Sequence, residues 1–457
     1  MASLDLILCY LYVKILEYAE KLPESRLKTM IISFSLQNYR SFKERQVLNL
    51  HVEQGDELPQ NIATPDNEKK IPVVRTAGIY GANASGKSNL LRGMQSALTL
   101  IFGSHKFDRN SDIPYYEPFQ LDDKTSNAPV EFELDFVVDG LHFRYTFAYT
   151  DKEITFEELA FYPSNKEAIL FSRKEGQNID QIMLGGLLKG KRRKISFLPN
   201  QLYLSVAANT EGGPQVLCDV WNAANHDVSI NLNGVIQAWP CNLLLDSPEG
   251  QQKLLHFLQA VGTGIDALSV EKNDEQLLAA MYQSLPPADR MLILDANKYK
   301  VRCGHRDSKG EMVYFDLTNE SMGSVRFLWM AGDIYYALKR GKVLVIDEMN
   351  TSLHPQLVEF LVELFNDPEI NTKNAQLIFS THDVTLMNPS YMRRDQLFFV
   401  DKNEEGISEL YALDEFSEVR KNTPFAKWYM QHRFNATPKL DYSSIRDFMK
   451  EETNAQE

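Results

Sequence analysis

Apolar residues recur along the chain in two periods, and these predict a protein that combines strands with helices. A mostly apolar run over residues 71–79 predicts a buried strand. The helical spacing of apolar positions from Lys87 to Phe102 predicts a helix soon after it. The short stretch between them is rich in glycine and small polar residues. The pattern therefore establishes the local order strand, glycine loop, helix.

Alternating apolar and polar positions predict a second, antiparallel part of the structure. Residues 130–136 and 141–147 alternate in this way on either side of Asp139 and Gly140. Because an Asp-Gly pair favours the tight turns that join adjacent strands, we expect a hairpin here. Residues 153–162 predict a further strand. Together these segments indicate an antiparallel β subdomain.

The second half of the chain contains two short apolar runs that each end in polar residues. Residues 342–346 and 376–380 predict buried strands, and residues 356–365 have helical spacing between them. Upstream, a helix is predicted to open at Ser321, a good N-cap residue, and to run to about Lys339. This half therefore adds strands and helices to the same α/β unit.

These elements predict an α/β fold, with a mixed sheet around the glycine loop, an antiparallel β subdomain and a mostly helical insertion. No segment sustains a heptad repeat, so a long coiled-coil arm is not expected. We expect five parts: an N-terminal extension outside the core (1–29), the N-terminal half of the core with the glycine loop and the β subdomain (30–163), the helical insertion (164–293), the C-terminal half of the core (294–440) and a tail (441–457).

Composition and charge narrow the classes of function. The chain has 457 residues and a formal net charge of −14, which argues against wholesale coating of nucleic acid. A basic run at residues 189–194 is either a solvated loop or a patch that contacts phosphates. The four cysteines form no Cys-x-x-Cys pair, so we expect neither a zinc site nor a disulfide framework. This cysteine usage fits a reducing cytoplasm best. Residues 4–19 are rich in apolar residues but carry Asp5, Lys14 and Glu17, which is too charged and too short for a membrane span. We expect an amphipathic helix or a weakly packed extension, and a membrane anchor is the less favoured alternative.

The stretch from Gly81 to Ser88 matches the phosphate-binding pattern G-x-x-x-x-G-K-[ST] at every defined position. Glycines let the backbone turn tightly and approach phosphates, and free N–H groups at the start of the following helix point at them. Lys87 would lie against the β- and γ-phosphates, and the Ser88 hydroxyl would ligate Mg²⁺. The loop therefore predicts binding of a nucleoside triphosphate. Contacts are expected from Gly81, Asn83, Ser85, Gly86, Lys87, Ser88 and Asn89.

Two acidic residues directly follow the apolar run at 342–346. Asp347, at the end of that strand, would hold Mg²⁺ opposite Ser88, either directly or through water. Glu348 is placed to polarise the attacking water as a general base. His382 ends the next predicted strand, where a sensor of the γ-phosphate would lie. These three residues predict a catalytic site for triphosphate hydrolysis.

Taken in order, the motifs of the chain give it a specific resemblance. They are Asn38-Tyr39-Arg40-Ser41-Phe42, the glycine loop, Glu320-Ser321-Met322-Gly323-Ser324, Ile346-Asp347-Glu348, Ser352-Leu353-His354-Pro355 and Ser380-Thr381-His382-Asp383. In this order the chain resembles ABC-type ATPases of the RecF/SMC branch. It is most similar to the AAA-type core ATPases of bacterial phage-defence systems, such as AriA- and RloA-like proteins, which are related to the ATPase part of OLD nucleases. The α/β core is then expected to be an ABC-ATPase-like head.

The resemblance also implies roles for particular residues. Ser321 and Gly323 would form the ABC signature, which contacts the γ-phosphate bound by a second subunit. Glu348 would be the base and His382 the switch residue. Arg40 would lie near the nucleotide phosphates, and Gln120 is the candidate for a further Mg²⁺ ligand. The family's D-loop falls on residues 349–353, where Met349-Asn350 departs from the usual apolar residue and acid.

The expected nucleotide is ATP, because the guanine-reading pattern N-K-x-D fails at its last position in residues 297–300. We expect a cytoplasmic ATPase that uses ATP and Mg²⁺ and works as a homodimer or higher homo-oligomer with ATP between subunits. It would be a nucleotide-switched sensor or scaffold in antiviral defence. Its effector would be a separate protein encoded nearby, because the chain after His382 is too short for an added nuclease domain. The alternative is a DNA-repair or DNA-end-binding ATPase that contacts DNA. The long stretch between Ser88 and Ser321 disfavours a transporter subunit.

Overall fold

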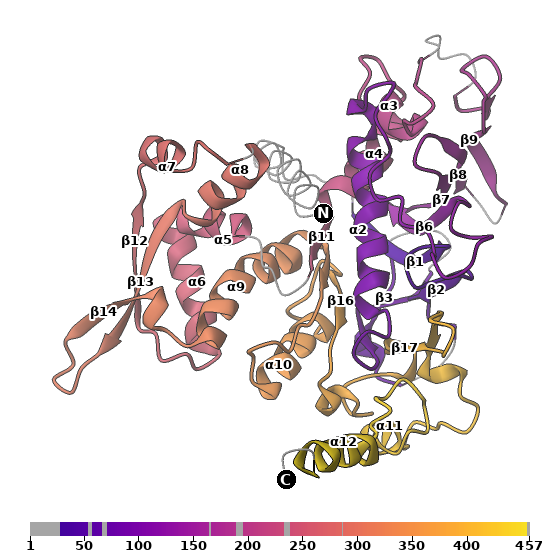
Figure 1. The fold of residues 1–457 in the computed structure, drawn as a ribbon. Helices are drawn as coiled ribbons and strands as arrows, with labels where there is room; N and C mark the ends of the chain where they lie inside the picture. Colours follow the sequence, from indigo (N-terminus) through magenta and orange to yellow (C-terminus); the bar gives the residue numbers. More distant parts are fainter. Residues whose placement is uncertain are drawn as a thin grey trace.

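The structure is a computed structural model in which two lobes lie on either side of a central mixed sheet (Figure 1). It describes residues 28–53, 57–65, 71–163, 166–188, 195–232, 238–285 and 287–454. Nearly all of the expected N-terminal extension, and the basic run at residues 189–194, lie outside these ranges. Within them the predicted α/β class is confirmed.

The mixed sheet carries the glycine loop at its edge. In spatial order its strands are β11 (Val228–Asn231), β15 (Val343–Ile346), β16 (Gln376–Ser380), β5 (Thr76–Tyr80), β17 (Leu397–Lys402) and β18 (Ser408–Ala412). All neighbouring pairs are parallel except β17 and β18. Because parallel strands end at the same edge, the residues that follow β5, β15 and β16 come together there. That edge is where Gly81, Asp347 and Thr381 lie.

Helix α2 (Lys87–Gly103) follows the glycine loop and lies between the mixed sheet and the antiparallel sheet (Figure 1). Its apolar residues, among them Leu91 and Met94, share one core with Phe34 of the antiparallel sheet and Val345 of the mixed sheet. The helix is therefore buried along most of its length, which fixes the loop at its start.

The antiparallel sheet confirms the predicted β subdomain. In spatial order its strands are β10 (Met183–Leu184), β9 (Ala168–Lys174), β8 (Ile154–Tyr162), β7 (Leu141–Tyr149), β6 (Val130–Val138), β1 (Thr29–Gln37) and β2 (Gln46–Asn49). The turn between β6 and β7 has positive φ at both Asp139 (48°) and Gly140 (78°), as the predicted tight hairpin requires. A small two-stranded sheet, β3 (Ile62–Ala63) with β4 (Val73–Val74), lies before β5.

Residues 164–293 are less uniformly helical than the sequence predicts. Their helices are α3 (Tyr203–Ala208), α4 (Gln215–His226), α5 (Trp239–Leu245), α6 (Pro248–Ala260), α7 (Glu275–Met281) and α8 (Pro287–Ala296). However, β9 and β10 complete the antiparallel sheet, and β11 adds an edge strand to the mixed sheet. A separate sheet of β12 (Ala267–Lys272), β13 (Tyr299–Arg306) and β14 (Met312–Asp316) forms the outer part of the helical lobe. This stretch therefore contributes strands to both the antiparallel sheet and the mixed sheet.

Two helices cover the other face of the mixed sheet. They are α9 (Met322–Arg340) and α10 (Pro355–Asn366), and both lie close to the predicted bounds. Phe327 of α9 and Phe365 of α10 share a second core with Leu344 and Phe379 of the sheet. The sheet is therefore apolar on both faces, as parallel sheets between helical layers are.

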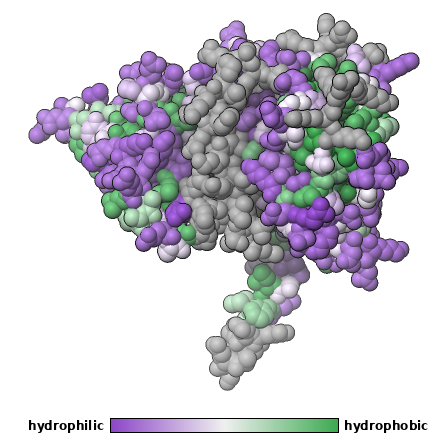
Figure 2. All heavy atoms as spheres, turned by 90° about the horizontal axis from the view of Figure 1, so that it is seen from above, coloured by the Kyte–Doolittle hydropathy of each residue, from purple (hydrophilic) through white to green (hydrophobic). Residues whose placement is uncertain are grey.

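The chain ends with α11 (Phe425–Met430) and α12 (Tyr442–Asn454), below the sheet in Figure 1. Short 3-10 turns connect several elements, at Pro59–Asn61, Ser104–Lys106, Leu317–Asn319, Val384–Leu386, Arg394–Gln396 and Leu413–Glu415. No helix within the described ranges has the length and apolar character to cross a membrane. Seen from above, the outer surfaces of both lobes carry many polar side chains (Figure 2).

Candidate functional site

The glycine loop depends on its two glycines for conformation and for space. Gly81 and Gly86 have positive φ, 154° and 123°. A Cβ atom on Gly81 would lie 2.3 Å from the carbonyl oxygen of Val400, and one on Gly86 would lie 2.6 Å from the Ser408 hydroxyl. The loop therefore packs tightly against β17 and β18, and larger residues at either glycine would displace it.

Lys87 is folded over the loop. Its Nζ donates to the carbonyl oxygens of Gly81 (2.8 Å) and Ala82 (3.0 Å), and the side chain is buried. Burial lowers the pKa of Lys87 to about 8, although the charges of Asp347 and Glu348 act in the opposite direction. The Lys87 amine is therefore close to the loop and to both acids.

The lowered pKa of Lys87 gives a pH dependence for nucleotide binding. The charged amine is the form that attracts phosphate, and in the free protein it is lost as the pH rises through about 8. We expect the affinity for ATP to be nearly constant below this pH and to fall up to about tenfold for each further pH unit. Titration calorimetry at several pH values measures this. An affinity that stays flat well above pH 8 would contradict the assigned role of the amine.

Ser380 connects the two acids. Its hydroxyl, fully buried at the end of β16, donates to Oδ1 of Asp347 and accepts from the backbone N–H of Glu348 (2.8 Å). Asp347 is buried, whereas Glu348 is exposed and has a left-handed backbone with φ of 51°. The Glu348 side chain is thereby turned outward, with its Oε2 3.3 Å from the Thr351 hydroxyl.

Replacing Ser380 by alanine tests this connection. The change removes the Ser380 donor to the Asp347 carboxylate and the acceptor of the Glu348 N–H, so both acids lose orientation. We expect kcat for ATP hydrolysis to fall about 10–100-fold with a smaller change in ATP affinity. Ser390→Ala, at an exposed serine of the same region, is the matched control. An unchanged kcat would show that the serine does not position the acids.

His382 lies within the same electrostatic neighbourhood. Its pKa is lowered by partial burial and by the charge of Lys87, while Glu348 and Asp347 raise it. Its backbone N–H and the Thr381 hydroxyl both point to Oδ1 of Asn350, at 3.3 Å and 3.0 Å. The asparagine that departs from the family pattern thus still supplies an acceptor to this segment.

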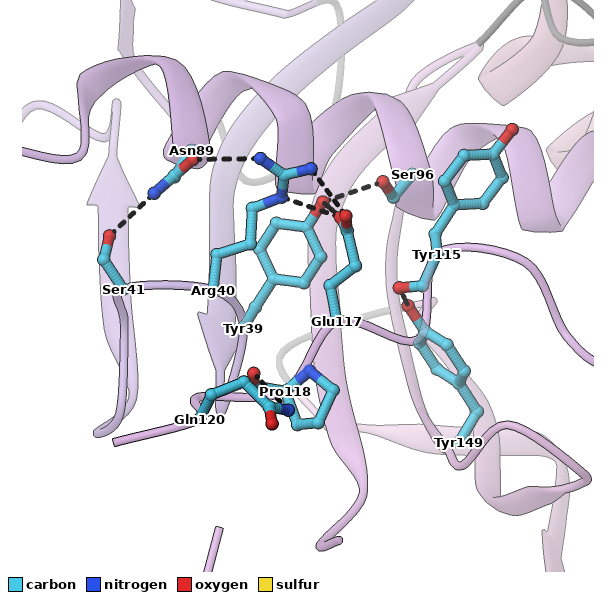
Figure 3. Close-up of polar contacts among 10 residues, drawn as sticks. All are labelled: Tyr39, Arg40, Ser41, Asn89, Ser96, Tyr115, Glu117, Pro118, Gln120 and Tyr149. Carbon is cyan, nitrogen blue, oxygen red and sulfur yellow. Dashed lines mark hydrogen bonds and ion pairs between the residues drawn. The ribbon is translucent and has the colours of Figure 1, made fainter. Parts of the chain in front are cut away.

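Arg40 lies beside the start of α2, with φ of 52° (Figure 3). Its guanidinium makes a two-point ion pair with Glu117, at 2.7 Å and 2.6 Å, and lies 3.4 Å from Oδ1 of Asn89. The Asn89 amide in turn donates to the Ser41 hydroxyl. Arg40 is therefore next to the helix that begins with Lys87 and Ser88, and its charge is paired.

Gln120 is on the loop that carries Glu117, but its side chain turns back on its own loop (Figure 3). Its amide donates to the carbonyl of Pro118 at 3.3 Å, and the residue is exposed. Its metal role remains a prediction from the resemblance.

The predicted signature begins α9 as expected. Ser321 caps the helix by accepting from the N–H of Ser324 at 3.0 Å. Gly323 packs on the D-loop, where an added Cβ would lie 2.7 Å from the Ser352 carbonyl. From the same helix, Arg326 donates to the carbonyl of Glu348 at 2.9 Å. The turn that begins α9 is thus attached to the segment that carries Glu348, the predicted base.

One comparison with known families settles the family. The sequence model described as "AAA domain, putative AbiEii toxin, Type IV TA system" matches residues 77–209 and 220–388, more than half of the chain. The chain belongs to this AAA-domain family. The matched ranges contain the glycine loop, the signature turn, both acids and His382, so the predicted P-loop ATPase class is confirmed.

Solved structures similar to this AAA-domain chain include two SMC heads. The SMC head domain from Thermotoga maritima is 14% identical, with 85% of this chain and 98% of that chain covered and a TM-score of 0.37. A second structure, an SMC head bound to the C-winged helix domain of ScpA, is 12% identical, with 84% of this chain and 97% of that chain covered and a TM-score of 0.35. No curated protein matches the chain.

The site of this AAA domain fits a magnesium–nucleotide complex. The loop has backbone space that only glycine provides, and the Ser85 hydroxyl within it is buried with no hydrogen-bond partner among the described residues. Hydroxyl and carboxylate oxygens, the ligands that Mg²⁺ prefers, are offered by Ser88 and Asp347. Asn83 is exposed on the outer side of the loop. The donor set therefore suits phosphate and a hard cation.

Sequence reasoning missed three residues of this AAA-domain site. Ser380 was part of a recognised motif, but the polar end of a buried strand did not reveal that its hydroxyl joins two acids. Glu117 pairs with Arg40, and Arg326 donates to the carbonyl of Glu348. Both contacts join residues that are far apart in the chain, so no local pattern predicts them. A serine between an apolar strand and the predicted sensor His382 was the one available signal.

Proposed function

We propose that the chain binds ATP with Mg²⁺ in the glycine loop and hydrolyses it. The observation that carries this proposal is the meeting of Lys87, Asp347, Glu348 and His382 at one edge of the mixed sheet, where the two acids act to raise the pKa of both Lys87 and His382. A cation, a metal-binding acid, a base and a polar sensor are the groups that phosphoryl transfer to water requires.

Each residue then has a defined task. Lys87 and the loop N–H groups hold the β- and γ-phosphates, and bound Mg²⁺ supplies charge neutralisation on the phosphate oxygens. Ser88 and Asp347 would hold the metal. Glu348, whose side chain is exposed, accepts the proton of the attacking water, and His382 donates a hydrogen bond toward the γ-phosphate.

The proposal includes a second copy of the chain that completes the site. Ser321 is exposed, and its neighbour Met322 is 77% exposed, so the signature turn presents an open surface. Helix α9 also carries no acidic residue in its first turn, which suits an anion. ATP held by one copy would be covered by Ser321 and Gly323 of the other, and hydrolysis would separate the pair.

The cellular role we propose is a cytoplasmic nucleotide-switched sensor or scaffold in antiviral defence, with a separate effector. The family description, which names a toxin of a toxin–antitoxin system, and the motif resemblance to phage-defence ATPases support it. Closure on ATP and release after hydrolysis would give such a scaffold its two states.

Mixing two inactive variants tests the shared site. Lys87→Ala disables the loop and Ser321→Arg blocks the signature, yet a mixed pair keeps one site with both parts intact. Half of randomly formed pairs are mixed, so the mixture should recover about one quarter of the wild-type ATPase rate.

Each variant measured alone is the control, and the ATPase rate of both should stay near background. Full activity in Ser321→Arg alone would mean that the signature is not needed. A mixture that stays inactive, although both variants are folded and associate, would contradict the contribution in trans.

A further inference from the structure

Glu320, the residue directly before the signature serine, is held by the outer sheet of the helical lobe. Its Oε1 lies 2.8 Å from Nε2 of His305, which is near the end of β13. The Glu320 side chain is only 9% exposed and that of His305 is 29% exposed. The carboxylate is therefore held toward β13 and is itself largely shielded from solvent.

This direction is unexpected for a carboxylate at that position. The start of a helix carries partial positive charge and unpaired N–H groups, so a neighbouring acid is normally attracted to it. In α9 the Ser321 hydroxyl caps the helix instead. The Glu320 carboxylate is turned to His305, which leaves the other N–H groups of the first turn available to an external anion.

We propose that His305 is a positioning residue that keeps the Glu320 carboxylate away from the signature turn, so that this turn can receive the γ-phosphate of ATP held by a second copy. The proposal rests on the proposed function and deepens it. Without His305, the carboxylate would swing to the helix start, occupy the N–H groups and repel the phosphate.

The surroundings of the pair support a built arrangement. The ring of Phe315, from the adjacent strand β14, packs against the His305 ring at 5.8 Å between centroids. Cys303, two residues earlier on β13, is fully buried, and burial together with the nearby Glu320 charge raises its pKa to about 12. The Glu320 carboxylate is thus close to both Cys303 and His305, which lie on the same face of β13.

The experiment measures ATP-dependent self-association by analytical ultracentrifugation, with Glu348→Gln in every sample to prevent turnover. His305→Leu removes the donor but fills the space beside Phe315, and it should weaken association about tenfold. His305→Leu combined with Glu320→Gln should return association to within about threefold of the parent, because the repelling charge is gone. His305→Gln, which keeps an amide donor, should also stay close to the parent.

A structural role alone would give a different pattern. If His305 only stabilised the sheet, the double variant would be at least as weak as His305→Leu, and that result would overturn the proposal. Parent-like association of His305→Leu would do the same. If His305→Leu does not fold, as judged by thermal melting, His305→Ala with and without Glu320→Gln makes the same comparison.

A matched control and the parent separate this inference from the proposed function. His256→Leu changes an exposed histidine on α6 and should not alter association. If the parent itself fails to associate with ATP, the shared site is wrong. If the parent associates and the His305 series shows no rescue, only the positioning role is wrong.

Discussion

Replacing Glu348 by glutamine is expected to lower the rate of ATP turnover about 10²–10⁴-fold while ATP binding persists. Glutamine has nearly the same shape but cannot take a proton from water. The backbone of residue 348 is held by the Ser380 hydroxyl and by Arg326, and neither contact involves the carboxylate. The variant should therefore keep the geometry of the site and accumulate an ATP-bound assembly.

Steady-state phosphate release and light scattering with ATP measure the two effects together. Glu369→Gln, at an exposed glutamate in the turn after α10, is the matched control and should behave as the wild type. Turnover of Glu348→Gln at the wild-type rate would show that another group acts as the base.

Lys87→Ala is expected to weaken ATP binding about 100-fold or more, since two charge-assisted contacts to phosphate are lost. The side chain is also buried and bonded to the carbonyls of Gly81 and Ala82, so the loop loses an internal brace. Folding should survive, because α2 is held by its apolar core on both sides.

Titration with a fluorescent ATP analogue measures the affinity, and thermal melting checks the fold. Lys427→Ala, an exposed lysine of α11, controls for the loss of one surface charge. Near wild-type affinity in a folded Lys87→Ala variant would remove the lysine from the phosphate site.

Local sequence patterns predicted the parts of the site that are built locally. The glycine loop lies between β5 and α2, and Asp347 directly follows β15, because strand, loop and helix signals are each read within a few residues. The same holds for Ser321, whose hydroxyl caps α9 by accepting from the backbone N–H of Ser324, three residues later. These features need no knowledge of the rest of the chain.

The features that the sequence did not reveal depend on contacts between distant residues. Arg40 was expected beside phosphates, but its pairing with Glu117 follows from a loop that returns after α2. The short strand β11 has no pattern strong enough to distinguish it within a helical region, and its place beside β15 is decided by the sheet. Such choices are made by packing across the whole fold rather than by propensity.

The hairpin of β17 and β18 forms one wall of the glycine loop, although it lies beyond the family-matched range, which ends at residue 388. The Ser408 hydroxyl donates to the carbonyl oxygen of Ser85 and lies 2.6 Å from where a Cβ atom on Gly86 would be. The carbonyl oxygen of Val400 lies in the same way against Gly81. A truncated protein ending at the family limit would keep the glycine loop, both acids and His382 and yet lose the strands that support the glycine loop. The smallest autonomous ATP-binding unit of this chain must therefore extend at least through β18.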